Sequence, residues 1–440
     1  MNGAPKTVQA KPGIASREAA VAILSQVLRR KRPLDHATAE ILAAANLTPR
    51  DSAFARAIAG ESLRRFGQLE ALIRTFVPKT PPPHKAGPTI EILIAAAAEL
   101  LLLKVPAHAV VDAANRLAQA DARAVHFKSL INAVLRRVAA EGAAVLERQD
   151  AGGLNAPDWL FQRWAAYYGG EQARSITQAH AMVPPLDLTL KAVDDPCTEL
   201  SGRLLLAPGR VRLSEPGNVT TLPGFADGRW WVQDFAASLP ARLLGNVAGQ
   251  AVIDLCAAPG GKTLQLAGAA AHVTAVDVSP ERLAMVAENL ERTKLTAELI
   301  AADARDWHPD TPAPFVLLDA PCSATGTIRR HPDLPWIKSA ADIVNAGSLQ
   351  SELLDAAAEM TAVGGTLIYA VCSLEPEEGV EQAEAFLARR AGFARHPLAA
   401  DEVFDSLFVT AKGDLATMPF HWADKGGMDG FYAARLRRLL

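Results

Sequence analysis

Reactive side chains in this sequence gather after apolar runs that are typical of buried β-strands. Cys372 directly follows one such run, and Cys322 lies four residues beyond another. A thiol becomes a nucleophile when its surroundings favour the thiolate, because a free cysteine has a pKa of ~8.5. No C-x-x-C spacing occurs, which disfavours a zinc site or a disulfide. The two cysteines are therefore candidates for covalent catalysis, and a pair of inert buried thiols is the alternative.

Aspartates occupy the same kind of position. Asp277, Asp303 and Asp319 each follow a predicted strand. Asp277 comes 23 residues after Asp254, close to the ~20-residue offset at which a carboxylate contacts ribose hydroxyls in nucleotide-binding βαβ units. Ligands bind beyond the carboxyl ends of the strands in open α/β sheets, so these carboxylates could share one site. Asp277 and Asp303 could instead be N-caps of the helices that follow them.

A glycine turn supplies a third chemical feature. The run Ala251 to Leu255 predicts a buried strand, which breaks at Pro259-Gly260-Gly261 before a helical pattern resumes at Thr263. A strand, a glycine turn and a helix form a cradle for an anionic or polar ligand at the helix N-terminus. A phosphate loop would need glycine at Cys256, and no G-x-G-x-x-G is present. By itself the turn fits any α/β domain.

Taken in order, five stretches resemble the successive motifs of the Sun/Nop2-type RNA cytosine-5 methyltransferases: DLCAAPGGKT, AVDVS, ADARDW, DAPCSATGTIRRHPD and YAVCSLEPEEG. The match spans Leu154 to the C-terminus and includes MDGFY near its end. Together with the helical region before it, the whole chain is similar to the bacterial RsmB-type enzymes of ribosomal RNA. The resemblance implies a Rossmann-like catalytic domain and S-adenosylmethionine as the methyl donor.

The resemblance also implies catalytic roles. It assigns Cys372 as the nucleophile that adds to carbon 6 of cytosine, and Cys322 as a residue that assists product release. It places Asp319 at the cytosine edge, close to the methyl donor. DNA cytosine methyltransferases use the Pro-Cys cysteine, here Cys322, as the nucleophile instead. Spacing alone does not decide between the two cysteines.

For the cofactor, the resemblance implies that Asp277 holds the ribose hydroxyls and that Asp303 lies by the adenine. Lys262 would lie near the methionine carboxylate. The residues that would wrap the methionine part are Cys256, Ala257, Ala258, Pro259, Gly260, Gly261 and Lys262. Beyond Cys322, the side chains of Arg329, Arg330 and His331 could meet a phosphate at the rim of the site or form a plain surface turn.

Charge divides the chain into two parts. Residues 1–150 contain 21 Lys and Arg against 13 Asp and Glu, a net charge of +8, and the remainder carries −11. A basic module attached to an acidic enzyme suggests that the first part helps to hold a polyanion such as RNA. Charge spread over solvated helices is the open alternative.

We expect a multidomain chain, as its 440 residues suggest. Residues 16–145 read as an all-α domain similar to the NusB-type RNA-binding domain, with Thr48-Pro49-Arg50-Asp51 as a helix start. Residues 155–225 read as a small α+β module that contains a β-like stretch from Leu186. Residues 226–440 form the predicted α/β Rossmann-like methyltransferase domain.

No apolar run is long enough to cross a bilayer, and the longest, Ile92 to Leu103, is interrupted by Glu99. We expect a cytoplasmic monomer that acts on RNA and binds no metal. The resemblance implies that this RNA is 16S ribosomal RNA. Two alternatives stay open. One is the same chemistry on tRNA or another RNA. The other is a non-catalytic NusB-like RNA-binding factor, which would have no need of Cys322, Cys372 and Asp319 together.

Overall fold

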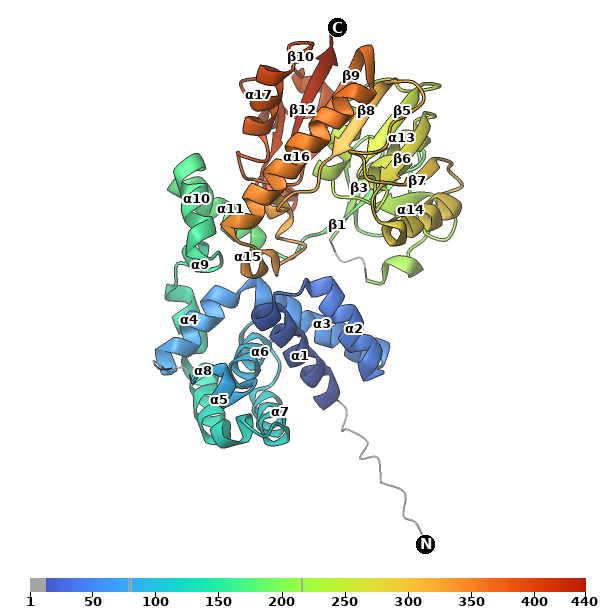
Figure 1. The fold of residues 1–440 in the computed structure, drawn as a ribbon. Coiled ribbons are helices and arrows are strands. Elements are labelled where there is room, and N and C mark those ends of the chain that lie inside the picture. The colour runs from blue at the N-terminus through green and yellow to red at the C-terminus, as the bar shows by residue number, and fades with distance from the viewer. Residues whose placement is uncertain (1–12, 78, 80, 215–216) are drawn as a thin grey trace. The chain divides into compact units, whose positions relative to one another are not determined.

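The computed structural model describes residues 13–77, 79, 81–214 and 217–440, and its contacts divide the chain into two compact units. The helical unit contains the residues up to Met182 together with His331–Lys338. The catalytic unit contains Val183–Arg330 and Ser339–Leu440. Figure 1 shows both units, with the colour running from blue at the N-terminus to red at the C-terminus. No helix in the described ranges is long and apolar enough to span a membrane.

The helical unit is built around α6, in which every residue from Glu91 to Glu99 is buried. Its helices are α1 (Ile14–Arg30), α2 (Leu34–Ala45), α3 (Pro49–Arg64), α4 (Phe66–Phe76), α5 (Pro83–Ala86), α6 (Thr89–Leu101), α7 (Ala107–Ala120), α8 (Lys128–Arg148), α9 (Ala151–Leu154), α10 (Asp158–Tyr168), α11 (Gly170–His180) and α15 (Leu334–Ile337). The predicted start of α3 is confirmed, because the Thr48 hydroxyl accepts a hydrogen bond from the Asp51 N–H at 3.1 Å. The two buried acids of α6 pair with Arg29 and Arg17.

One segment of the helical unit comes from far along the sequence. Residues 331–338, which carry α15, follow the chain's Cys322 loop but pack among the helices of this unit. The Trp336 indole N–H donates to the carbonyl of Leu63 at 3.0 Å, and its ring meets Phe66 edge-on with centroids 4.8 Å apart. Nothing in the local sequence indicates that these eight residues belong with the first half of the chain.

The catalytic unit contains two sheets. The smaller sheet is antiparallel in the order β2-β3-β1-β4, with β1 (Leu186–Leu190), β2 (Arg203–Ala207), β3 (Arg210–Leu213) and β4 (Trp230–Val232). The larger sheet has the order β10-β12-β9-β8-β5-β6-β7, and β11 pairs with β12. Its strands are β5 (Ala251–Leu255), β6 (His272–Asp277), β7 (Glu298–Ala301), β8 (Ala313–Asp319), β9 (Thr361–Val371), β10 (Phe393–Arg395), β11 (Leu415–Thr417) and β12 (Phe431–Arg438).

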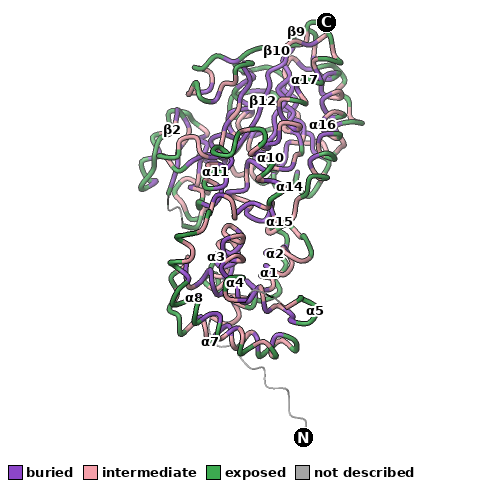
Figure 2. Tube along the Cα trace, turned by 90° about the vertical axis from the view of Figure 1, so that its left-hand side faces the viewer, coloured by how far each residue is buried: buried purple, intermediate pink, exposed green. Residues whose placement is uncertain are grey.

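Strands β5 to β9 of the larger sheet are parallel, and β12 runs antiparallel beside β9. Successive side chains alternate between two cores, as a strand period of two requires. Leu317 packs with α12 (Leu239–Arg242) and α13 (Gly261–Gly268), whereas Val316 and Leu318 pack with α16 (Ala340–Met360) and α17 (Val380–Arg389). Helix α14 (Pro280–Thr293) follows β6. The central strands of this sheet are largely buried (Figure 2), and the stretch from Gly365 to Val371 is buried throughout.

Strand order reverses at β5. From β5 the chain proceeds through β6 to β7 on one side, and it then returns to β8 and β9 on the other side. Such a switch point opens a crevice beyond the carboxyl ends of the strands, where ligands bind in open α/β sheets. The predicted Rossmann-like architecture is confirmed, and the topology places the candidate site at the ends of β5 and β8.

Candidate active site

Parallel pairing brings the predicted site residues to one edge of the larger sheet. Asp277 ends β6 and Asp319 ends β8. Cys322 follows β8 by three residues, and Cys372 directly follows β9. Because β8 and β9 are neighbours in register, with Asp319 opposite Ala370, the two cysteine loops must leave the sheet side by side.

The cysteine sulfurs lie in contact. The Sγ atoms of Cys322 and Cys372 are 3.4 Å apart, and the loops are joined by the Gly326 N–H, which donates to the Cys372 carbonyl at 3.0 Å. The hydrogen bond with Cys372, together with burial, raises the pKa of the Cys322 thiol well above its usual range. Cys322 therefore holds its proton at neutral pH and can act as a donor toward the Cys372 sulfur.

An acidic and basic pair lies at the end of β8, three residues before Cys322. The Lys262 ammonium, on α13, donates to Asp319 Oδ2 at 2.6 Å and lies 5.0 Å from the centre of the Phe431 ring. Asp254 is fully buried behind this pair and accepts a hydrogen bond from the Thr263 hydroxyl at 2.6 Å. Burial raises the pKa of Asp254 to about 7. Lys262, Asp319 and Asp254 line a cavity of about 280 Å³ together with residues of the glycine turn.

A second cavity, of about 230 Å³, opens between the ends of β6 and β7 and the loop after β8. Asp277, Asp303 and Cys256 line it, as does Val278, whose side chain is 68% exposed. The Asp277 carboxylate accepts hydrogen bonds from the N–H groups of Ala258 and Ser279, both at 3.0 Å. A buried carboxylate beside an exposed apolar surface fits the ribose and the base of a nucleoside.

The turn between the cavities is closely packed. Gly260 has φ +99°, and a Cβ there would lie 2.9 Å from the Val286 side chain, so no other residue fits without displacement. Burial raises the pKa of Cys256 to about 12, so its thiol stays protonated and its backbone is the useful part. Asp303 is held by Arg305 at 2.6 Å, which orients it at the cavity rim. The residues present therefore fit a methyl donor that carries an adenosine part.

Two parts of the chain match models of known protein families. The model for "16S rRNA methyltransferase RsmB/F" matches residues 241–437, and the model for the NusB family matches residues 14–140. Ribosomal RNA small subunit methyltransferase B of Pseudomonas syringae pv. tomato is 37% identical, over 96% of this chain and 97% of that protein. The chain belongs to the RsmB/F ribosomal RNA methyltransferase family.

Other relatives and solved structures extend the comparison. Ribosomal RNA small subunit methyltransferase B of Vibrio cholerae is 37% identical, over 85% of this chain and 89% of that protein. The crystal structure of PH0851 shares the fold with a TM-score of 0.74 at 22% identity, over 96% of this chain and 99% of that one. NSun6 from Pyrococcus horikoshii matches with a TM-score of 0.56 at 19% identity, over 64% of this chain and 98% of that one. RsmB/F membership makes the chain an RNA methyltransferase that depends on S-adenosylmethionine.

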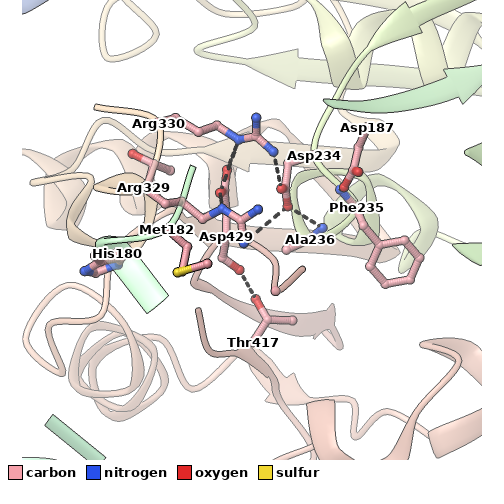
Figure 3. Close-up of polar contacts among 12 residues, drawn as sticks. His180, Met182, Asp187, Asp234, Phe235, Ala236, Arg329, Arg330, Thr417 and Asp429 are labelled. Carbon is pink, nitrogen blue, oxygen red and sulfur yellow. Dashed lines mark hydrogen bonds and ion pairs between the residues drawn. The ribbon is translucent and has the colours of Figure 1, made fainter. Parts of the chain in front are cut away.

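In this RsmB/F chain the arginines after Cys322 are turned inward. Arg330 pairs with Asp234 at 2.6 Å and with Asp429 at 2.9 Å, and Arg329 lies 3.5 Å from Asp429 (Figure 3). Both acids are buried, and burial raises the pKa of Asp429 to about 7. The two guanidinium groups thus contact carboxylates, so the structure supports neither a phosphate site at these arginines nor a plain surface turn.

Sequence reasoning missed several residues that shape the site. Asp234 and Asp429 were outside every predicted strand end, and Val278 carries no polar group to attract notice. The MDGFY motif gave a usable signal. Its Gly430 N–H donates to the Gly326 carbonyl at 2.8 Å, and a Cβ on Gly326 would lie 2.0 Å from the Gly430 oxygen. The C-terminal motif thereby holds the loop that carries Cys322.

Proposed function

We propose that this chain transfers a methyl group from S-adenosylmethionine to carbon 5 of a cytosine in 16S ribosomal RNA, through a covalent adduct with Cys372. The observation that carries the proposal is the pair of cysteine sulfurs 3.4 Å apart at the ends of adjacent parallel strands, with Asp319 at the end of one of them. A methyltransferase that acts on an activated oxygen or nitrogen has no need of two adjoining thiols.

Carbon 5 of cytosine is a poor nucleophile, so the enzyme must first activate it. The Cys372 thiolate adds to carbon 6, which makes carbon 5 enamine-like. When bound, S-adenosylmethionine supplies an electrophilic methyl group on a sulfonium. Asp319, which Lys262 contacts at 2.6 Å, would hydrogen-bond the N3 edge of the base. N3 takes up a proton from water as the thiolate adds, which neutralises the negative charge on the ring, and the Asp319 carboxylate accepts the new N3–H.

The adduct must then break down. By then carbon 5 has taken the methyl group, N3 has released its proton, and S-adenosylhomocysteine is left. Water takes the proton from carbon 5, the double bond between carbons 5 and 6 re-forms, and the bond between carbon 6 and the Cys372 sulfur breaks. Cys322 keeps its proton because of its contact with Cys372 and its burial, so it can hydrogen-bond the departing thiolate. This division of work supports Cys372 as the nucleophile and Cys322 as the residue that aids release.

The substrate must present an unstacked cytosine, because carbon 6 is inaccessible to a side chain within a helix. Single-stranded loops of RNA meet this requirement. The choice of 16S ribosomal RNA rests on the family description and on relatives named for the small ribosomal subunit. As proposed, the enzyme works in the cytoplasm, and the net charge of +8 up to residue 150 helps to hold the RNA.

The test compares three cysteine variants on 16S RNA. Cys372→Ala should abolish methylation and any adduct, whereas Cys322→Ala should form the adduct and fail to resolve it, so that a protein–RNA species survives denaturing electrophoresis. Cys197→Ala is the matched control, because Cys197 is buried in the smaller sheet's core. Bisulfite sequencing of total RNA from a deletion strain would identify the methylated RNA.

An adduct that accumulates with Cys372→Ala and is absent with Cys322→Ala would reverse the two roles. Full activity of both variants would rule out covalent catalysis. A deletion strain that keeps every 5-methylcytosine in its 16S RNA but loses one in tRNA would move the substrate to tRNA.

A further inference from the structure

A buried carboxylate near the two cysteines is not used by the chemistry above. Glu378 lies in the loop between β9 and α17, and its side chain is 0% exposed. Within the described ranges no lysine or arginine forms an ion pair with it. A carboxylate in such a place is costly unless hydrogen bonds compensate for its lost hydration. Its partners therefore indicate what it does.

Those partners are the residues that follow the two cysteines. One carboxylate oxygen accepts the backbone N–H of Ser323 at 2.8 Å and the Gln350 amide at 3.2 Å. The other accepts the hydroxyls of Ser323 and Ser373. Ser323 directly follows Cys322, and Ser373 directly follows Cys372. A single side chain thus holds the position after each reactive thiol.

Further hydrogen bonds fix the same two loops to each other. The Thr325 hydroxyl accepts the Leu374 N–H at 3.0 Å and donates to the Ser373 hydroxyl at 3.3 Å. Gln350, on α16, also donates to the Pro321 carbonyl at 3.0 Å, just before Cys322. A buried hydrogen-bond network in which every polar group has a partner holds its loops in one conformation. Glu378 is the member that contacts both loops by its own oxygens.

We propose that Glu378 is a positioning residue that sets the separation of the two thiols, holding them close enough for Cys322 to act on the sulfur of Cys372. Its carboxylate ties both cysteine loops to one point, so its loss frees each loop to shift. A displacement near 1 Å at reacting atoms can reduce a rate by about 100-fold. The effect of Glu378 on catalysis rests on the proposed function, whereas its effect on the distance between the two thiols does not.

A trivalent arsenical tests the separation without RNA. Phenylarsine oxide binds two adjacent thiols by forming two arsenic–sulfur bonds and releasing water, and peptide mapping shows whether Cys322 and Cys372 are joined. Glu378→Gln keeps the shape of the side chain and removes its charge. Glu381→Gln is the matched control, because it makes the same change at an exposed position in the first turn of α17. We expect bridging to slow by about tenfold or more in Glu378→Gln and Glu378→Ala, and to be unchanged in Glu381→Gln.

The same variants are then assayed on RNA. We expect kcat to fall by about 10- to 100-fold with adduct accumulating, while the KM for S-adenosylmethionine stays at the wild-type value. If Glu378→Ala does not fold, Ser323→Ala and Ser373→Ala remove the same hydrogen bonds one at a time. Wild-type bridging rates in Glu378→Gln and in both serine variants would overturn the proposal. Slowed bridging with normal methylation would uphold the positioning role and refute the part of Cys322 in product release, whereas covalent attack by Cys372 is tested separately by the cysteine variants.

Discussion

Substitution of Asp277 tests the proposed cofactor site directly, through the affinity for S-adenosylmethionine. Its side chain is 2% exposed, and its two oxygens each accept one backbone N–H, from Ser279 and from Ala258. A carboxylate oxygen has room for about two hydrogen bonds. The oxygen that Ala258 contacts also lies 3.6 Å from the Arg282 guanidinium, so the oxygen that Ser279 contacts is the one that keeps a site for a ribose hydroxyl in the cavity that Asp277 lines. Replacing Asp277 with Ala removes these acceptors.

The magnitude follows from the number of bonds lost. One charge-assisted hydrogen bond to ribose contributes ~1.5–3 kcal/mol, and 1.4 kcal/mol corresponds to a tenfold change in affinity. Asp277→Ala should therefore raise the Kd for S-adenosylmethionine by about 10- to 150-fold. The variant should also lose stability, because two backbone N–H groups lose their partner at ~1–3 kcal/mol each. Asp277→Asn keeps one acceptor and should show a smaller loss of both.

The assay is isothermal titration calorimetry with two ligands, S-adenosylmethionine and S-adenosylhomocysteine. The two share the ribose but differ in charge, because only the first carries a sulfonium. A role through the ribose predicts the same fold-loss for both. Glu281→Ala is the control, since Glu281 is an exposed acid in the first turn of α14 and does not line the cavity. Unchanged affinity in folded Asp277→Ala would refute the assignment, and a loss confined to S-adenosylmethionine would replace it with attraction to the sulfonium.

Asp254 and the helical unit yield the remaining predictions. Burial raises the pKa of Asp254 to about 7, against ~3.9 unfolded, so its contribution to stability is present below pH ~4 and is lost as the pH rises through 7. In urea denaturation, the free energy of unfolding of Asp254→Asn should rise relative to that of the wild type by ~1.4 kcal/mol for each unit of pH increase across that window. If the two free energies of unfolding keep a constant difference across these pH values, the prediction is wrong. Removing residues 1–145 should leave cofactor affinity unchanged while weakening RNA binding and flattening its salt dependence, because basic side chains release counterions. The truncation should also red-shift the fluorescence of Trp336, because it removes the Phe66 ring that contacts the indole. If RNA binding has the same salt dependence in the truncated and full-length proteins, the basic excess is incidental.

The ends of the parallel strands could be predicted because they follow from local pattern plus one topological rule. Short apolar runs predicted β5, β6 and β8, and each run ends within a residue of its observed boundary at Leu255, Asp277 and Asp319. Parallel pairing then places their carboxyl ends at one edge whatever the exact strand order. This is why the sequence alone assigns Asp277, Asp319 and Cys372 to one candidate site.

The residues that the sequence did not reveal act through partners far away in the chain. Arg330 contacts acids 96 and 99 residues distant, and Glu378 contacts Ser323 across 55 residues. No spacing rule connects such positions. In the sequence a buried, paired arginine looks the same as one that is free to bind phosphate. The membership of residues 331–338 in the helical unit was hidden for the same reason.

The net charge of a region can be predicted from the sequence even though the pairing of each arginine cannot. Pairs such as Arg17 with Glu99 and Arg29 with Glu91 bury basic residues that might have been assigned to RNA. Each pair, however, removes one charge of either sign. With 21 basic and 13 acidic residues up to position 150, at least eight basic side chains cannot have an acid of that region to themselves. The excess must therefore persist in any folded arrangement of the region, and the salt slope of RNA binding measures how much of it contacts phosphate.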